Sequence, residues 1–128
     1  MGAMHPEDRQ AVAAGLIDAR ADLAARITAL DRTLGELVDA ADLEPPDDEH
    51  DPDGTTAYER AQVISLAREG RARLRAIDRA LGDIDGPDFG RCEACGGEIG
   101  APRLLAVPET RRCVRCAGLD RRPPVTPR

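Results

Sequence analysis

Hydrophobic residues recur every three or four positions over two long stretches of the chain, which is the spacing of helices that pack along a narrow seam. The first stretch begins at Pro6, a residue well suited to the first helical position, and ends before Pro45 and Pro46, which cannot continue a helix. We therefore predict a coiled-coil type helix over residues 6–43. Its seam positions are Val12, Leu16, Ala19, Leu23, Ile27, Leu30, Leu34, Leu37 and Ala41.

The second stretch predicts another helix, from Thr56 to the Gly86-Pro87 pair. Thr56 and Glu59 have the spacing of a capping box, in which each side chain would satisfy a backbone amide of the first turn. Gly70 and Arg71 interrupt the pattern in the middle. The expected seam positions are Ala57, Ala61, Ile64, Ala67, Leu74, Ile77, Leu81 and Ile84.

The segment between the two stretches is short, acidic and rich in proline. A short connection brings consecutive helices together at high effective concentration, which favours an antiparallel hairpin within one chain over a dimerising coiled coil between chains. We expect a mainly α fold, a long antiparallel two-helix coiled-coil hairpin with a small C-terminal four-cysteine module. The expected divisions are a hairpin over 4–86 with an acidic tip loop at 44–55, a module over 87–120 and a disordered tail over 121–128.

The amino-acid composition excludes several folds and functions for this chain. It has one Phe, one Tyr, no Trp and 33% charged residues, so a large aromatic core is excluded. We see no apolar stretch long enough to span a bilayer and no secretion signal near the start, and we expect a cytoplasmic protein. No arrangement of nucleophile, base and phosphate-binding glycines is present, which predicts a protein without enzymatic activity.

Four cysteines near the C-terminus carry the strongest chemical signal. Cys92, Cys95, Cys113 and Cys116 form two Cys-x-x-Cys pairs separated by 17 residues, the spacing of a structural zinc site. Each pair can present two thiolates from a tight turn, and Gly96 and Gly97 ease the first of these turns. We predict that these four residues bind one structural Zn²⁺. Two disulfides, which need an oxidising compartment, and a thiol redox switch are the alternatives.

Charge is divided unequally along the sequence. Residues 1–90 carry 20 acidic residues and 10 arginines, whereas residues 91–128 carry 4 acidic residues and 8 arginines. The basic end could contact nucleic acid, or its arginines could offset the negative charge of four zinc-bound thiolates. We favour the second interpretation, because no aromatic residues are interleaved for base stacking. The arginines concerned are Arg111, Arg112, Arg115, Arg121 and Arg122.

The residues around the cysteines resemble a known family. The run from Asp88 to Ile99, the Arg103-Leu104 pair with Ala106 and Pro108, and the second cysteine pair are similar to the C4 zinc finger of the bacterial DksA/TraR transcription factors. The resemblance implies a regulator that binds RNA polymerase core through the secondary channel, with the coiled-coil tip directed at the active site. It implies changed initiation without recognition of promoter DNA by sequence. A zinc-ribbon protein that binds nucleic acid and oligomerises through its helices is the alternative.

The same resemblance identifies candidate partner-binding residues at the tip. The family pattern of two aspartates followed by alanine falls on Thr56, Glu59 and Ala61, so the first acid is missing here and the second is glutamate. Neighbouring acids of the loop could act instead, and they are Asp47, Asp48, Glu49, Asp51 and Asp53. Guanosine tetraphosphate acts with some members of the family. The second helix is about one heptad shorter here than in the longest members, so we do not assume that cooperation. We expect a monomer that does not bind a membrane.

Overall fold

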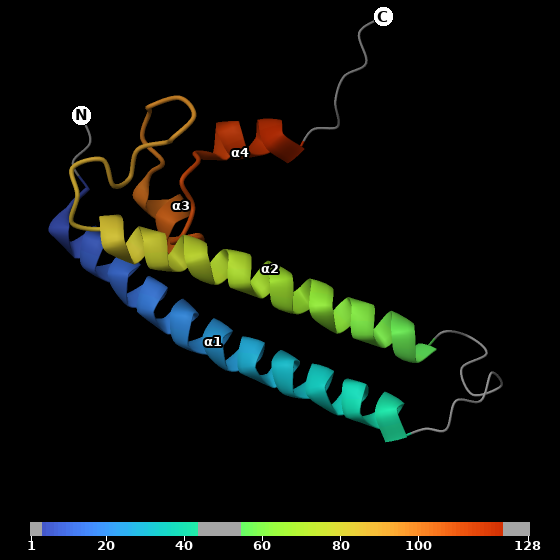
Figure 1. Ribbon diagram of the computed structural model, residues 1–128. Coiled ribbons are helices and arrows are strands. Elements are labelled where there is room, and N and C mark those ends of the chain that lie inside the picture. Colours follow the sequence, from blue (N-terminus) through green and yellow to red (C-terminus); the bar gives the residue numbers. More distant parts are fainter. Residues whose placement is uncertain (1–3, 44–54, 122–128) are drawn as a thin grey trace, which may run out of the picture. The chain divides into compact units, whose positions relative to one another are not determined.

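The computed structural model describes residues 4–43 and 55–121, which form four helices (Figure 1). Helix α1 spans Pro6–Leu43 and α2 spans Thr55–Asp83, and two short helices follow, α3 at Ala101–Ala106 and α4 at Val114–Arg121. No β-strand occurs in the described residues, apart from an isolated antiparallel bridge between Arg91 and Glu98. The mainly α fold class is therefore confirmed. Thr55, the last residue of the predicted tip loop, begins α2 instead, and the rest of that loop and all but the first residue of the predicted tail lie outside the described residues.

The chain divides into two compact units, and both long helices pass from one unit into the other. The first unit comprises residues 1–20 and 76–128. In it, α1 and α2 run antiparallel around three fully buried side chains, those of Val12, Leu16 and Ile77. Arg9 of α1 donates to the backbone carbonyl of Ile84 just past α2, at 2.9 Å. That carbonyl lies beyond the end of α2 and would otherwise lack a helical partner.

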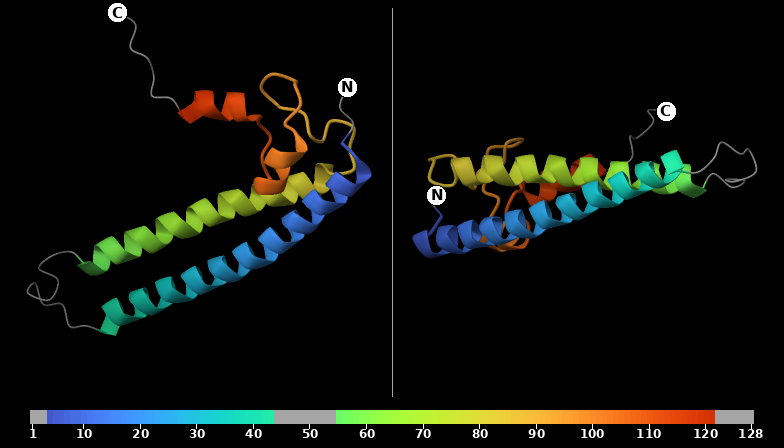
Figure 2. Two further views of the ribbon diagram at one scale, coloured as in Figure 1. Left: turned by 180° about the vertical axis from the view of Figure 1, so that it is seen from behind. Right: turned by 60° about the horizontal axis from the view of Figure 1, so that its bottom comes forward.

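The second unit comprises residues 21–75 and contains the remainder of the helix pair. Its buried side chains are Leu23, Ile27 and Ala67, and α1 and α2 again lie side by side (Figure 2). Gly70 does not interrupt the seam, contrary to our expectation. A Cβ atom added there would lie 3.1 Å from Cγ1 of Ile27, so the missing side chain allows the two helices to approach closely. Arg71 lies beside the seam and forms an ion pair with Asp31 at 2.6 Å.

The expected seam is wrong at the start of α2. Ala57, Ala61 and Ile64 are exposed, whereas the residues one position earlier, Thr56, Arg60 and Val63, are half-buried. The observed seam continues without interruption in steps of four and three residues. Its members in this unit are Thr56, Arg60, Val63, Ala67, Gly70 and Leu74. Sequence reasoning assigned the seam positions from the apolar residues alone. The regular heptad spacing instead determines which positions are buried, so one polar and one charged residue lie in the seam.

The capping box at Thr56 is also wrong. Helix α2 begins at Thr55, which places Thr56 inside the first turn rather than at the N-cap. Glu59 is exposed and forms no hydrogen bond or ion pair with another described residue. Within residues 4–43 and 55–121, its carboxylate therefore has no partner at the start of the helix. In the described part of the chain, no helix is both long and apolar enough to cross a membrane.

Two glycine substitutions test the close approach at Gly70. Gly35 is exposed on α1, and a Cβ added there would meet no atom within 4 Å, so Gly35→Ala should stabilise the protein by about 1 kcal/mol through helix propensity alone. Gly70→Leu should instead lower the free energy of unfolding by about 1–3 kcal/mol, because the new side chain must displace Ile27. Urea denaturation followed by circular dichroism measures both. Equal or greater stability of Gly70→Leu relative to the wild type would contradict the packing described.

Candidate metal centre

The first cysteine pair lies in a tight turn that follows the isolated bridge residue Arg91. The amide of Cys92 donates to the carbonyl of Gly97 at 2.7 Å, and the amide of Gly96 donates back to the carbonyl of Cys92 at 2.9 Å. Gly96 has a φ of 75°, a conformation in which a side chain would be strained. The amide of Gly97 points at Sγ of Cys95, 3.4 Å away. The turn thus directs a backbone dipole at one of its own sulfur atoms.

The second pair lies at the start of α4. The amide of Cys116 approaches Sγ of Cys113 at 3.5 Å, and the amide of Ala117 donates to the carbonyl of Cys113 at 2.9 Å. A third bond joins the two halves of the site, since the amide of Glu93 donates to the carbonyl of Arg111 at 2.8 Å. The long excursion between the pairs therefore returns alongside the first turn, as the spacing of the cysteines predicted.

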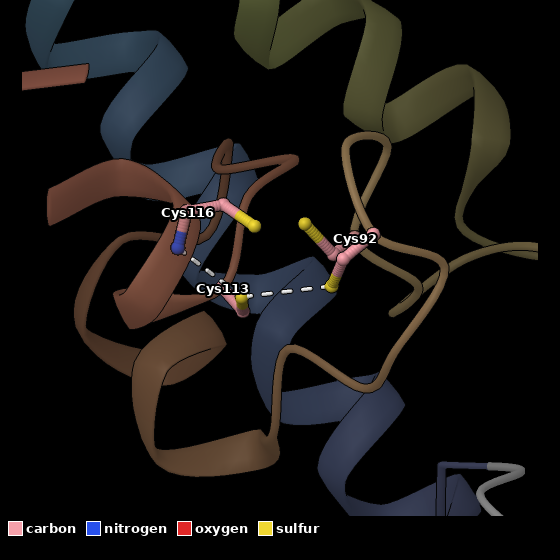
Figure 3. Close-up of side chains that lie close together, drawn as sticks. Cys92, Cys113 and Cys116 are labelled. Atoms are coloured by element: carbon pink, nitrogen blue, oxygen red, sulfur yellow. Dashed lines mark hydrogen bonds between the residues drawn. The ribbon is translucent and has the colours of Figure 1, made fainter. Parts of the chain in front are cut away.

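The four sulfur atoms lie within 4.8 Å of one another. Those of Cys95 and Cys113 are 3.9 Å apart, and Figure 3 shows the side chains of Cys92, Cys113 and Cys116 converging on a common space. A tetrahedral zinc ion with Zn–S bonds of about 2.3 Å places its sulfur ligands about 3.8 Å apart. The donor set and its spacing therefore fit zinc. All four cysteines are free thiols in the structure, in contrast to the disulfide alternative.

The protonation of the thiols differs around the site. Backbone hydrogen bonding, chiefly from the amide of Cys113, lowers the pKa of Cys92 to about 6. The amide of Cys116 likewise lowers the pKa of Cys113. Cys116 itself donates to the sulfur atoms of Cys113 and Cys92, and this raises its pKa to about 12. These hydrogen bonds thus shift Cys92 and Cys113 toward the thiolate form and Cys116 toward the protonated thiol, each relative to an ordinary cysteine. A divalent cation at the centre would favour all four thiolates.

Arg103 of α3 holds the segment that leads into the second pair. Its Nε donates to the carbonyl of Arg112 at 2.7 Å, and one of its terminal nitrogens lies 3.3 Å from the hydroxyl of Thr110. That hydroxyl also donates to the carbonyl of Arg112 at 3.1 Å. From the sequence, Arg103 was identified only as part of the family resemblance, and no role was predicted for it. Its distance from the cysteines along the chain gave no sign that it would bond next to Cys113.

Few apolar side chains support the module. Among residues 87–118, the side chains that are buried, apart from cysteine, belong to Ile99, Leu104 and Pro108. Ion pairs account for two of the basic residues, since Arg111 pairs with Asp83 at 2.7 Å and Arg112 pairs with Glu93 at 3.3 Å. Arg115 is exposed, whereas the side chains of Arg121 and Arg122 lie outside the described set. Two of the predicted charge-compensating arginines are therefore paired with carboxylates close to the cysteines.

The candidate tip residues are only partly described. Thr56 is half-buried, and Glu59 and Ala61 are exposed near the start of α2, in the unit that does not contain the cysteines. The five loop acids, Asp47, Asp48, Glu49, Asp51 and Asp53, lie outside the described residues. Their role stays a prediction.

Comparison with known proteins connects this module to a family. The prokaryotic DksA/TraR C4-type zinc finger matches residues 87–120. The RNA polymerase-binding transcription factor DksA of Escherichia coli is 35% identical over 92 residues, which are 70% of this chain and 58% of that protein. An uncharacterised protein of Aquifex aeolicus is 44% identical over 64 residues, covering 50% of this chain and 44% of that one. The chain thus matches roughly half of the length of these relatives.

A solved structure extends the similarity to most of the chain. Transcription factor DksA2 from Pseudomonas aeruginosa superposes with a TM-score of 0.71 and 27% sequence identity, covering 90% of this chain and 84% of that protein. The fold similarity to this solved relative thus covers more of the chain than the zinc-finger match over residues 87–120. The chain belongs to the DksA/TraR family of prokaryotic proteins with a C4-type zinc finger.

Proposed function

We propose that this protein is a cytoplasmic transcription regulator that binds bacterial RNA polymerase core through the secondary channel and modulates initiation. The observation that carries the proposal is the similarity over 70% of the chain to a relative named as an RNA polymerase-binding transcription factor. In this proposal the protein acts as a monomer and catalyses no reaction. The α1–α2 end that bears the acidic segment 44–55 is directed at the polymerase active site.

The proposed effector groups are carboxylates. Polymerases hold catalytic magnesium ions through oxygen ligands, and negative side chains delivered nearby would change the field around those ions. Glu59 supports this role, because it is exposed and makes no hydrogen bond or ion pair with any residue that the structure describes. Thr56 would lie beside it on α2, Ala61 follows two residues later, and the acids of the loop would add further charge. The expected consequence is an altered lifetime of the open complex.

We further propose that Cys92, Cys95, Cys113 and Cys116 hold one structural zinc ion. The ion would supply charge neutralisation and four bonds to the module, and it would take no part in chemistry. Support comes from the spacing of the sulfur atoms and from the small number of buried aliphatic side chains around them. Arg103 and Thr110 would maintain the approach of Cys113 to the ion.

The alternative of a nucleic-acid-binding zinc ribbon receives less support. Arg111 and Arg112 are already paired with carboxylates, which weakens the attraction of the module for phosphate. In the described residues, the apolar seams of α1 and α2 cover each other within one chain, so these seams are not available for oligomerisation. A protein of net charge −6 is also poorly suited to nonspecific binding of DNA.

Zinc removal should melt the module and leave most helix intact. Helices α3 and α4 contain 6 and 8 residues, against 38 and 29 in α1 and α2, so far-ultraviolet ellipticity should fall by less than about a fifth. Hydrogen exchange should lose protection over residues 87–121. Cys95→Ser should lose the ion, whereas the neighbouring control Ala94→Ser should keep one zinc per chain by elemental analysis. Unchanged exchange after complete removal of zinc would contradict a structural role.

Neutralising the loop acids should separate binding from effect. We expect the variant with all five acids changed to their amides to bind core polymerase as the wild type does, but to lose its effect on open-complex lifetime. A pull-down and a transcription assay on a ribosomal promoter, with and without guanosine tetraphosphate, measure the two properties. A control neutralises five exposed acids on the helices: Asp18, Asp22, Glu36, Asp39 and Glu69.

The control should retain both properties. Loss of binding together with the effect in the loop variant would contradict a tip that acts after docking. Full effect in the loop variant would contradict a role for these carboxylates.

A further inference from the structure

A cavity of about 460 Å³ lies beside the metal centre, in the unit of residues 1–20 and 76–128. Its walls come from the end of α2, the segment 86–93, the first cysteine turn, and Thr110 and Arg111 before the second pair. Of the four cysteines, only Cys92 lines it, so the cavity is not the space on which the sulfur atoms converge. Its volume is typical of pockets that bind small organic molecules, which span about 300–1,000 Å³.

The charged groups of the lining leave one acid and one base without partners. Arg111 pairs with Asp83 at 2.7 Å, which connects the segment before the second cysteine pair to the end of α2. Glu93 pairs at 3.3 Å with an arginine that does not line the cavity. Asp88 and Arg91 are exposed, and their side chains form no hydrogen bond or ion pair with another described residue. The lining therefore offers one free carboxylate and one free guanidinium.

A tight turn holds these two residues close together. The amide of Arg91 donates to the carbonyl of Asp88 at 3.1 Å, which is the hydrogen bond of a four-residue turn whose end Cα atoms lie within about 7 Å. Gly90, the third residue of the turn, has a φ of 93°, a conformation in which a side chain would be strained. The amide of Ile99 donates to the carbonyl of Gly90 at 2.8 Å and so connects this turn to the first cysteine turn.

Apolar surface lines the same cavity. Phe89, inside the turn, is half-buried, and it lines the cavity together with Pro87. Ile99 and Ala80 are buried and also belong to the lining. Mostly apolar walls with a few polar groups that fix orientation are characteristic of sites for organic ligands. The cavity thus combines apolar walls with one free group of each charge.

We propose that this cavity binds a small organic zwitterion with an apolar body, which is the chemistry of a free apolar α-amino acid or of a short apolar peptide. The ammonium group of the ligand would pair with Asp88, its carboxylate with Arg91, and its side chain would cover Phe89 and Ile99. In an α-amino acid both charged groups are attached to one carbon atom, which suits an acid and a base at the ends of one turn. The inference goes beyond the proposed function and does not depend on polymerase.

The balance of charge favours a zwitterion over a phosphate compound such as guanosine tetraphosphate. Two of the three carboxylates in the lining are neutralised by arginines, and so is one of its two guanidiniums. A polyanion would find Arg91 alone as a free cation and would be repelled by Asp88, three residues away. A zwitterion finds an opposite charge for each of its own.

Calorimetric titration of the full-length, zinc-loaded protein tests the class of ligand, with L-leucine and leucyl-leucine as probes. N-acetyl-leucine lacks the ammonium group, leucinamide lacks the carboxylate and glycine lacks the apolar body. Each of the three should bind at least about tenfold more weakly than leucine. Tighter binding of leucine would support a free amino acid as the ligand, and tighter binding of leucyl-leucine would support a peptide. Equal affinity for leucine and N-acetyl-leucine would overturn the zwitterion.

Two variants test the assigned groups. Asp88→Asn and Arg91→Gln should each weaken leucine binding about tenfold or more, because each leaves one charge of the ligand without a partner. The controls Asp85→Asn and Arg79→Gln make the same changes at exposed residues of this unit that do not line the cavity and form no ion pair. They should bind within about twofold of the wild type. Zinc content and circular dichroism check that all four variants are folded.

Ligand binding should also stabilise the module. The walls of the cavity come from both sides of the cysteine turns, so opening of the module destroys the cavity. Free leucine at a hundred times its Kd should therefore slow the amide exchange that requires this opening, in residues 86–111, by about a hundredfold. Exchange in residues 21–43, which belong to the other unit, should be unchanged and serves as the internal control.

Each remaining outcome decides against a stated part of the inference. Absence of binding by both probes at millimolar concentration would overturn the site. Unchanged affinity of the Asp88 and Arg91 variants would place the ligand elsewhere and overturn the assigned groups. Binding of guanosine tetraphosphate in the absence of leucine binding would overturn the ligand class. Failure of the wild type to bind core polymerase would overturn the proposed function alone, because the titration contains only this protein and its ligand.

Discussion

The clustering of four sulfur atoms within 4.8 Å of one another is the constraint on which the C-terminal module depends, because four thiolates at this spacing would repel one another. Backbone amides lower the pKa of Cys92 and Cys113, while the neighbouring sulfur atoms raise that of Cys116. A central cation changes this repulsion into attraction and would bind all four as thiolates. Because Ile99, Leu104 and Pro108 are the only buried residues besides cysteine in the module's described part, metal binding and folding of the module are expected to be one event.

The helix pair is stabilised by different interactions from those of the module. In the unit of residues 21–75, heptad spacing buries Leu23, Ile27 and Ala67, and Gly70 lets the backbones approach. In the other unit, Arg111 of the module pairs with Asp83 at the end of α2, which connects the metal centre to the helices. Loss of metal would therefore act mainly on one unit. The two kinds of support explain how a chain with so few aromatic residues can be ordered.

Sequence reasoning predicted α1 to the residue and identified the cysteine cluster, because periodicity over many turns and ligand spacing are strong signals. It placed the seam one residue too late at the start of α2, where alanines give weak contrast between faces. It also read Gly70 as a break, since a missing side chain gives no indication of what packs against it. The bonds of Arg103 depend on the path of the chain between the two pairs, which no local pattern encodes.

The correction at α2 changes the functional interpretation. Residues first assigned to the core, such as Ile64, are exposed, and Glu59 is a carboxylate without a partner in the part of the chain that the structure describes. Neither result affects the proposal that the fold of one unit depends on a metal ion bound by the four-cysteine module. X-ray absorption at the zinc edge of the purified protein tests that claim most directly. We predict four sulfur neighbours at about 2.3 Å, whereas folded protein that lacks zinc, or zinc bound by nitrogen or oxygen, would contradict it.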